Sequence, residues 1–282
     1  MAVTLADIKA LREKTGAGMM DVKNALNEAD GDVARAEELL RLKGLKTAAK
    51  REGRTASAGL VLSRILQEGS HEVGVVLEVN SETDFVAKNE KFIAFAQEIL
   101  DAAIAANAMT LDEVLAAPHA DGTVADRVAN FTGIIGEKLA VGSFNVLKGE
   151  HVEAYMHRTS PDIPPQVAVL VATDAAGESV ARDVAMHIAA MSPRYLSEAD
   201  VPEDVVENER RIATELTIQE GKPEQAVPKI VEGRLKGFFK QVTLLDQPYA
   251  RDAKQTVSQI LKAAGATCTG FVRVRVGDAA GE

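Results

Sequence analysis

The sequence predicts an α+β protein. A small N-terminal helical bundle precedes two similar units of antiparallel strands and helices, and a helical hairpin is inserted in the second unit. Three observations lead to this prediction. Apolar residues recur with a helical period over roughly the first 45 residues. Two apolar, strand-like stretches, at 73–79 and 167–172, are each followed by a polar connection and an Ala-rich amphipathic run. A charged helical run with few apolar positions occupies residues 203–220.

The first predicted helix begins at Thr4, whose hydroxyl can accept a hydrogen bond from a backbone N–H of the first turn. Leu5, Ile8 and Leu11 follow at spacings of three, so we expect them to form its buried stripe. The glycine-rich segment at 15–18 ends this helix.

The second helix is expected from about Met19 to Ala29 and the third from about Val33 to Leu42, with Gly44 as its stop. Their expected inward-facing residues are Val22, Ala25, Leu26, Val33, Ala36 and Leu40. The basic segment 46–54 that follows has two open interpretations, a solvated linker or a contact with an acidic partner surface.

Two later regions share one pattern: two strand candidates, a short polar connection and an Ala-rich amphipathic helix. We interpret this pattern as a duplicated α+β unit with antiparallel pairing. The segments are 60–66, 73–79 and 92–106 in the first unit, and 152–157, 167–172 and 180–191 in the second. A last strand alternates Val272, Val274 and Val276 on one face with Arg273 and Arg275 on the other.

The predicted hairpin consists of a helix at 203–220, a break at 221–223, and a second helix at 225–240 that has Pro228 near its start. Its apolar positions, Val206, Ile212 and Leu216, are sparse. A thin stripe of this kind suits pairing with itself or with another chain better than burial in the body. The expected domains are 1–55, 56–148, 149–194 together with 241–282, and the hairpin 195–240.

Composition and charge narrow the classes of function that the chain can have. The net charge of −10 is uneven, with 11 Lys/Arg against 9 Asp/Glu in residues 1–58 and 21 against 33 in the rest. An acidic body argues against nucleic acid as the main partner, because phosphate contacts need clustered cations. Cys268 is the only cysteine, and the five histidines show no HxxxH or HxH spacing, so we expect no metal site and no cofactor. The apolar stretches fall short of a membrane span and no signal peptide is recognised, so a cytoplasmic protein is expected.

Catalytic motifs find no support in the sequence. Gly221-Lys222 is followed by Pro223 and lacks the upstream glycine of a phosphate loop. No serine stands in a GxSxG context. We therefore expect that the chain is not an enzyme.

The most informative segment is 80–88, where the strand at 73–79 ends in a tight corner, Thr83–Val86. Ser81 and Asp84 could form a capping box there, with Phe85 in the core. The alternative is functional, because Phe85 follows directly on the polar run from Glu82 to Asp84. A carboxylate and an aromatic ring without a nucleophile suit prying at a partner better than making or breaking bonds.

Met19 and Met20 open the second helix, and two adjacent side chains cannot both face inward on a helix. At least one should therefore be exposed, where methionine offers a soft contact surface for a partner. Lys23 lies one turn further on the same face.

Segments 15–26 and 83–88 resemble the two signatures of the bacterial elongation factor Ts family, the guanine-nucleotide exchange factors of elongation factor Tu. The resemblance extends over nearly the whole chain in the family's order. It includes Ile135-Gly136-Glu137, Tyr155-x-His157, His187 to Ala190, Glu220 to Pro223, Val231 to Arg234 and Gln247-Pro248.

The resemblance implies a fold: a three-helix ubiquitin-associated-like domain, a core of two similar α+β subdomains, and a helical hairpin used for dimerisation. It also implies a site. Asp84 and Phe85, with Thr83 and Val86 beside them, would push into the GTPase domain of elongation factor Tu and displace its Mg²⁺ near the β-phosphate. Further partner contacts are implied for Met19, Met20, Lys23, Ile135, Gly136 and His157.

The chain departs from the family pattern at three places. Ser81 stands where many relatives have Cys, and Ser is small enough to leave the corner intact. Ala250-Arg251 stands where some relatives have Val-Met, so that contact is not implied. The sequence stops at Glu282, so contacts of the C-terminal helical module of some relatives are not expected.

Two other function classes compete with an exchange factor. A pure adaptor that binds a nascent chain or a regulatory protein would explain the N-terminal half, but it gives the corner no purpose. A hydrolase that uses His157 and Asp162 has no supporting motif.

Overall fold

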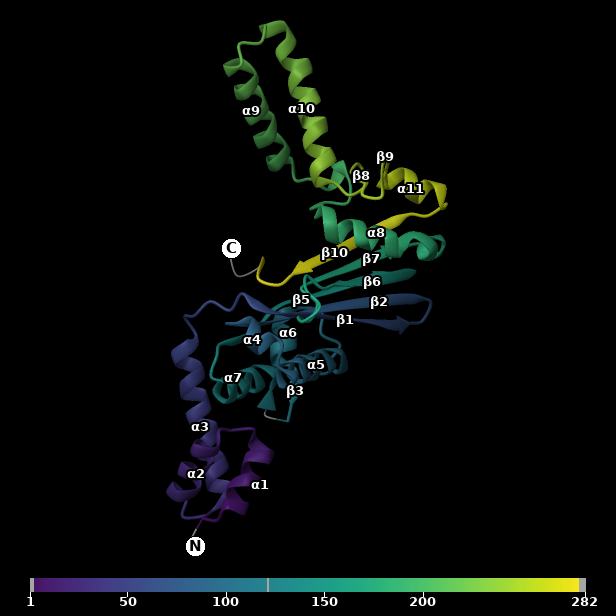
Figure 1. Ribbon diagram of the computed structural model, residues 1–282. Coiled ribbons are helices and arrows are strands. Elements are labelled where there is room, and N and C mark those ends of the chain that lie inside the picture. Colours follow the sequence, from purple (N-terminus) through teal and green to yellow (C-terminus); the bar gives the residue numbers. More distant parts are fainter. Residues whose placement is uncertain (1–2, 121, 279–282) are drawn as a thin grey trace.

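The computed structural model describes residues 3–120 and 122–278, and it is built around two three-stranded antiparallel sheets that face each other. Helices cover the outer face of each sheet. The N-terminal bundle and the helical hairpin project from opposite ends of this body (Figure 1). The α+β class and the predicted order of bundle, duplicated unit and hairpin are confirmed.

The first sheet contains β1 (Ala58–Glu68), β2 (His71–Ser81) and β5 (Leu139–Gly149) in the order β1-β2-β5. The central strand β2 alternates between two buried environments, since successive side chains of a strand point to opposite faces. Its odd-numbered residues, Val73, Val75, Leu77 and Val79, pack with the helices of the first core. That core is closed by α5 (Glu90–Ala105), which buries Phe92, Phe95 and Ile99.

The second sheet repeats this topology with β6 (His151–His157), β7 (Val167–Thr173) and β10 (Cys268–Arg275), in the order β10-β7-β6. Its central strand β7 is again followed by a helix, α8 (Glu178–Met191), which packs on the odd-numbered residues of β7. Both units therefore have the strand-strand-helix order that the sequence pattern predicts, and each adds a third strand, of which only β10 was predicted.

The two sheets meet through a third core of small and branched apolar residues. Its buried members are Val61, Val76, Val152, Ala168, Leu170, Ala172 and Val274. The approach is closest at Gly74, where an added Cβ would lie 2.8 Å from Val152 Cγ1 and 3.0 Å from Leu170 Cδ2. A side chain at this position would push the sheets apart.

The buried polar residues of this interface are satisfied at one end of the sandwich. The carboxylate of Glu78, 1% exposed, accepts hydrogen bonds from the Asn80 side chain, the Ser143 hydroxyl and the backbone N–H of Gly277. Gly277 also lies against the carbonyl of Ser57, where an added Cβ would approach to 2.7 Å. The end of β10 is thereby tied to the segment that leads into β1.

Several elements lie in stretches for which the sequence made no prediction. The most consequential is α7 (Val124–Ile135), which packs on α3 and precedes β5. The remaining elements are β5, α4 (Asp84–Ala87), α6 (Leu111–Ala116), β3 (Pro118–His119), β4 (Gly122–Thr123), η1 (Ala175–Gly177), η2 (Glu198–Asp200), β8 (Pro248–Tyr249), β9 (Asp252–Thr256) and α11 (Val257–Ala263).

The N-terminal bundle consists of α1 (Leu5–Thr15), α2 (Met19–Glu28) and α3 (Val33–Arg51). Thr4 caps α1 as predicted, in a reciprocal capping box with Asp7. The bundle core contains Ile8, Leu11, Ala17, Val22, Ala25, Leu26, Ala29 and Ala36. The predicted burial of Leu5 and Val33 is wrong, because each lies in the first turn of its helix and faces solvent, 61% and 47% exposed.

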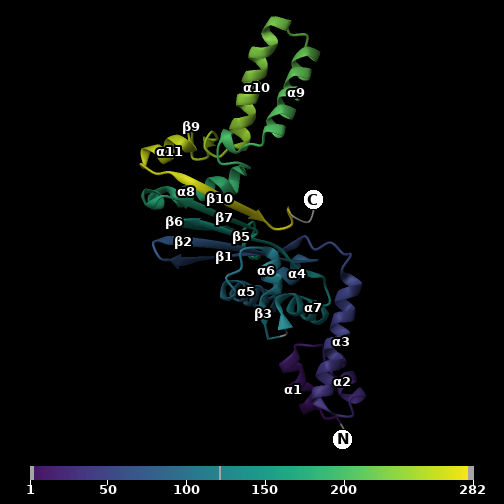
Figure 2. The same cartoon turned by 180° about the vertical axis from the view of Figure 1, so that it is seen from behind.

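The predicted stop at Gly44 is also wrong, and so is the solvated linker after it. Helix α3 continues to Arg51, because Gly44 keeps a helical backbone and uses its missing side chain for packing. It faces Gly133 of α7 so closely that a Cβ added at Gly133 would lie 2.3 Å from Gly44 Cα. Figure 2 shows α3 running from the bundle to the body, where it lies beside α7.

The hairpin pairs α9 (Glu203–Gln219) with α10 (Val227–Val242) through η3 (Glu224–Ala226). Its small core is Ala213, Val231 and Leu235, flanked by Val227 and Phe239. Leu216 was expected in the apolar stripe but is 44% exposed, and Ala213 and Thr217 occupy the contact with α10 instead.

At the base of the hairpin, His187 of α8 is locked in one tautomer. Its Nε2 lies 2.8 Å from Gln247 Oε1, and its Nδ1 accepts a hydrogen bond from the backbone N–H of Ala250. Burial lowers the pKa of His187, and the hydrogen bond to Gln247 opposes that shift. The lowered pKa therefore favours the uncharged imidazole of His187, which is the form that accepts the hydrogen bond from Ala250.

Among the described residues, no helix is both long enough and apolar enough to cross a bilayer. The predicted domain boundaries at 55, 148, 194 and 240 stay a prediction. The expected end of the chain at Glu282 lies outside the described residues.

The crossing of α3 and α7 gives a stability prediction with an internal control. Gly133→Ala should destabilise the protein by about 1–3 kcal/mol, because the new Cβ would meet the backbone of α3. Gly44→Ala should be tolerated, since its Cβ would have only ordinary contacts of 3.7 Å. Both changes replace glycine by alanine within a helix, so urea unfolding of the two variants isolates the clash. Equal stability of the two would contradict the crossing.

Candidate functional site

The corner, Thr83–Val86, follows directly on the end of β2, and its last three residues lie in the one-turn helix α4. Phe85 is 81% exposed, the highest value among the large apolar side chains that the structure describes as exposed. The alternative with a capping box and a core Phe85 is therefore wrong. The hydroxyl of Ser81 instead donates to the carbonyl of Thr83 at 2.8 Å, within the corner itself.

Helix α4 is anchored from its inner side. Ala87 is 1% exposed, and Val86 packs partly buried against the first core. Because successive residues of a helix point about 100° apart, burying Val86 and Ala87 turns Phe85 outward. The exposed ring is thus a consequence of the packing below it.

Thr83 is held by the carboxylate of Glu137. The backbone N–H of Thr83 donates to Glu137 Oε2 at 3.1 Å, and its hydroxyl lies 2.9 Å from Oε1. Glu137 comes from the turn after α7, where Gly136 has a φ of +77° that favours glycine. Of the predicted support residues, Ile135 packs against the first core and Gly136 shapes this turn, so both lie beside the corner.

Glu82 forms the second anchor, at the residue just before the corner. Its carboxylate accepts hydrogen bonds from the backbone N–H of Lys138 at 2.6 Å, from Arg51 at 2.8 Å and from Arg54 at 2.9 Å. The hydrogen bond from Lys138, followed by those from Arg54 and Arg51, lowers the pKa of Glu82 to about 2 against an opposing effect of burial. We call these four residues, Glu82, Arg51, Arg54 and Lys138, the Glu82 clamp.

Asp84 is far less constrained than its neighbours. Among the residues that the structure describes, its side chain pairs only with Lys88, at 3.2 Å across one helical turn, and it is 58% exposed. An exposed pair of this kind contributes little stability. The carboxylate of Asp84 is therefore free to exchange Lys88 for a group on another molecule.

The N-terminal residues form a separate surface. Met19 and Met20 are 46% and 62% exposed on the first turn of α2, and Lys23 is exposed as well. The prediction that at least one methionine faces solvent is confirmed. In Figure 1 the bundle that carries them lies below the body, and α3 connects it to the region of the corner.

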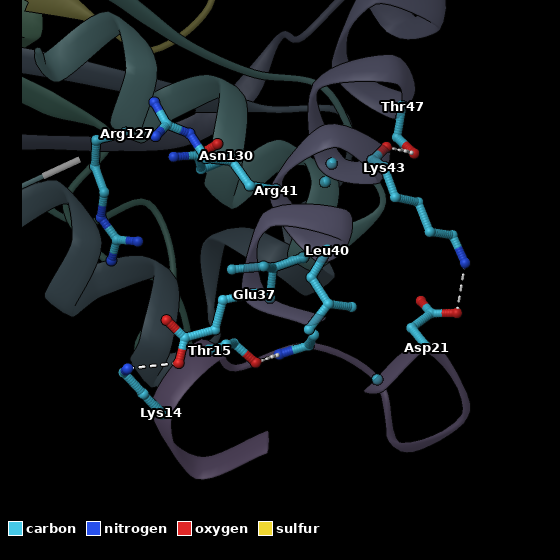
Figure 3. A pocket seen from close by; sticks show the side chains of 15 residues that line it. Lys14, Thr15, Asp21, Glu37, Leu40, Arg41, Lys43, Thr47, Arg127 and Asn130 are labelled. Atoms are coloured by element: carbon cyan, nitrogen blue, oxygen red, sulfur yellow. Dashed lines mark hydrogen bonds and ion pairs between the residues drawn. The ribbon is translucent and has the colours of Figure 1, made fainter. Parts of the chain in front are cut away.

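A cavity of about 460 Å³ separates the bundle from α7 (Figure 3). Ion pairs cross its rim within the bundle, between Lys14 and Glu37 at 2.5 Å and between Lys43 and Asp21 at 2.6 Å. Asn130 of α7 also lines it. The bundle thus touches the body along one side and leaves a gap on the other.

His157 ends β6, and its Nδ1 lies 3.1 Å from the hydroxyl of Tyr155. The flanking Met156 and Arg158 line a groove of about 400 Å³ together with Lys88. The end of β6 therefore lies on the side of the body that carries the corner. Ala250 and Arg251, where the family contact was not implied, bind His187 and Asp183 respectively.

The corner exposes few chemical groups. Within the described parts of the chain, no group of three His, Cys, Asp or Glu side chains is placed to hold a metal ion. What the corner offers is an exposed phenyl ring, a loosely held carboxylate and a rigid base.

The anchoring residues were not predicted as such. Glu82 stood in the polar run, and Glu137 stood in the resemblance, yet neither was assigned a supporting role. Their partners lie 28 to 56 residues away in the sequence. The available signal was the pair of basic residues at the end of a helix and an acid just before the corner.

Comparison with known proteins gives a consistent result. The family model described as elongation factor TS matches residues 82–278. The chain is 56% identical to elongation factor Ts of Beutenbergia cavernae over 276 residues, 97% of this chain and 98% of the relative. It is 53% identical to elongation factor Ts of Kocuria rhizophila and 50% identical to that of Bifidobacterium longum subsp. infantis, with at least 97% of each chain covered.

The lowered pKa of Glu82 gives a pH prediction. A carboxylate that titrates lower in the folded than in the unfolded chain contributes stability above the unfolded pKa, and this contribution is lost as the pH falls from about 4.5 towards about 2. Glu82→Gln should lower the free energy of unfolding by about 1–3 kcal/mol at pH 7. The difference between wild type and variant, measured by urea unfolding at several pH values, should shrink across that window. A difference that stays constant with pH would show that the clamp does not hold an ionised Glu82.

Proposed function

The chain belongs to the elongation factor Ts family and is a translation elongation factor, and from this premise we propose that it is the guanine-nucleotide exchange factor of elongation factor Tu. It would bind the GDP-bound partner in the cytoplasm and promote release of GDP, so that GTP can enter. The observation that carries this proposal is the 81% exposed Phe85 on a one-turn helix that is anchored on its other side. An apolar ring held out in this way is a contact surface for another molecule.

The size of the required effect is set by nucleotide affinity. If a GTPase holds GDP at about nanomolar affinity with an ordinary association rate, release takes roughly minutes. Acceleration by about 10³–10⁴-fold, fast enough for translation, corresponds to roughly 4–6 kcal/mol.

This free energy has to come from a difference in binding. The factor must bind the state with loosened nucleotide more tightly than the GDP-loaded state. By linkage, nucleotide must weaken the binding of the factor by the same coupling free energy. A rigid wedge suits this requirement, because it fits only the conformation that has opened to admit it.

We assign the corner residues complementary roles. Phe85 enters the GTPase domain as the wedge, and Asp84 leaves Lys88 to compete for partner groups around the Mg²⁺ ion. That ion is among the largest local charges that hold the phosphates, so disturbing it weakens GDP binding. Thr83 and Val86 keep the wedge oriented through Glu137 and the first core.

The remaining predicted contacts complete the interface. The exposed Met19, Met20 and Lys23 would hold the same GTPase domain from the bundle. Ile135 and Gly136 would support the contact around Phe85. His157 would face the other domains of the partner. In this proposal the chain acts by binding alone, without a cofactor or catalytic chemistry of its own.

A homodimer through the hairpin is a second part of the proposal. Helix α9 carries five acidic and two basic residues, whereas α10 carries four basic and one acidic residue. Leu216 and Ile218 are 44% and 60% exposed on α9. A second copy in antiparallel orientation would place acidic α9 against basic α10 and cover these two side chains.

Phe85→Ala is the direct test of the wedge. With elongation factor Tu loaded with fluorescent GDP, the variant should release nucleotide about tenfold more slowly at saturating factor, a loss of roughly 1.4 kcal/mol. Its unfolding free energy should not change, because the ring is exposed. Met109→Ala, another exposed apolar residue, is the matched control and should act like wild type.

Exchange at the wild-type rate by Phe85→Ala would refute the wedge. No acceleration by the wild type, with binding intact, would instead favour the adaptor.

In the same titration, Met20→Ala should raise the half-saturating concentration and leave the maximal rate nearly unchanged, because Met20 is proposed to hold the partner and not to open its nucleotide site.

Sedimentation velocity tests the homodimer. The double variant Leu216→Ser/Ile218→Ser should sediment as a monomer at concentrations where wild type forms a dimer, because it removes the apolar side chains that the second copy covers. Met109→Ser serves as the control. A wild-type chain that remains monomeric at the highest soluble concentration contradicts this part of the proposal.

A further inference from the structure

We propose that Arg51 and Arg54, at the end of α3, are positioning residues that hold the corner in the orientation needed for exchange. This inference rests on the proposed function and adds residues that touch neither nucleotide nor metal in it. The argument starts from the carboxylate of Glu82, the residue adjacent to Thr83.

Both oxygens of that carboxylate are bound by α3 and the segment after it. Arg51 Nη1 lies 2.8 Å from Oε1 and Arg54 Nη1 lies 2.9 Å from Oε2. The side chains of Glu82 and Arg51 are only 16% and 24% exposed. Hydrogen bonds between charged groups are stronger where water is partly excluded, so these contacts fix the backbone just before the corner.

Lys138 closes the arrangement into a ring. Its backbone N–H donates to Glu82 Oε1 at 2.6 Å, and its side-chain ammonium donates to the carbonyls of Glu52 and Arg54 at 2.6 and 2.8 Å. Carbonyl groups at a helix end lack hydrogen-bond donors within the helix, and the ammonium group of Lys138 supplies those donors here. The ring thus runs from the end of α3 to Glu82, on to the turn after α7, and back to α3.

An exposed ion pair between β1 and α5 differs from the Glu82 clamp in its burial. Arg64 and Asp101 lie 2.7 Å apart, but their side chains are 40% and 54% exposed. Such a pair orders little around it. Arg64→Gln therefore removes one arginine from the body without touching the corner, which makes it a matched control.

The same helix also carries the bundle. Helix α3 crosses α7 at Gly44 and Gly133 before it reaches the clamp, and Gly16 at the end of α1 lies against Ile134 of α7. The position of Met20 and the orientation of Phe85 are therefore set by one continuous element. A partner that binds the bundle therefore meets Phe85 in a fixed orientation.

This role has a kinetic signature. Without the two arginines, Phe85 and the contact surfaces remain, but the corner can take up several orientations. The factor should still bind the partner, whereas fewer of the complexes hold the wedge in the productive position. The maximal rate of GDP release should fall, and the half-saturating concentration should change little.

The experiment compares wild type, Arg51→Gln/Arg54→Gln, Arg64→Gln and Phe85→Ala in fluorescent-GDP release from elongation factor Tu. We expect the double variant to lower the maximal rate about tenfold, with less than about a twofold change in the half-saturating concentration. Arg64→Gln should match wild type. Arg51→Lys/Arg54→Lys should restore part of the rate, because lysine keeps the charge but not the fixed geometry of the guanidinium.

Amide hydrogen exchange gives a readout that does not depend on nucleotide. The N–H groups of Ala87 and Lys88 are bonded to carbonyls within the corner, and their exchange should accelerate in the double variant while that of β7 stays unchanged. The single variant Arg54→Gln, at a more exposed arginine, provides the same test if the double variant folds poorly.

Three outcomes would overturn the inference: a wild-type maximal rate, a raised half-saturating concentration at an unchanged maximal rate, or unchanged amide exchange in the corner. Failure of the proposed function looks different. Wild type would then not accelerate GDP release, while the corner amides would still loosen in the double variant.

Discussion

The rest of the site depends on the hydrogen bonds that the ionised carboxylate of Glu82 accepts. This carboxylate joins three segments that are distant in the sequence: the end of α3, the corner after β2, and the turn between α7 and β5. Each segment alone is short and polar, and none has a core of its own. The charged carboxylate, bound by three donors, holds these segments together where apolar packing is lacking. The exposed ring of Phe85 beside it thereby becomes a rigid feature of the surface.

The two units of the duplicated fold differ at the connection that follows the central strand. Both units turn from their central strand into a helix. After β7 the turn is sealed, since Asp174 exchanges hydrogen bonds with the backbone of Thr267 and Gly177 packs on Thr173. Each connection contains one short helical turn, η1 after β7 and α4 after β2, but only α4 carries an exposed aromatic ring, that of Phe85. The turn after β7 is thus closed by its own contacts, whereas the turn after β2 leaves Phe85 on the surface.

Local patterns in the sequence were sufficient for β1, β2, β6, β7 and β10, for most helices and for the corner, but not for β5 or α7. Alternation and apolar runs identified β2 and β7, because both faces of these strands are buried. Glycine at position 44 misled the helix assignment, since its role is a contact with α7 and not a change of backbone direction. Leu5 and Val33 have the spacing of core residues, but each lies at the start of its helix, where the first turn extends beyond the bundle core and leaves the side chain exposed. The clamp depends on pairings that no local pattern reveals.

The meeting of Gly44 and Gly133 sets the distance between the bundle and the body. Where two helices touch backbone to backbone, a side chain at the contact would hold them further apart. On either side of this contact, Gly16 lies against Ile134 and Arg51 and Arg54 reach Glu82. The two glycines thus fix how near α3 runs to α7, and with it how far the methionines of the bundle lie from the corner.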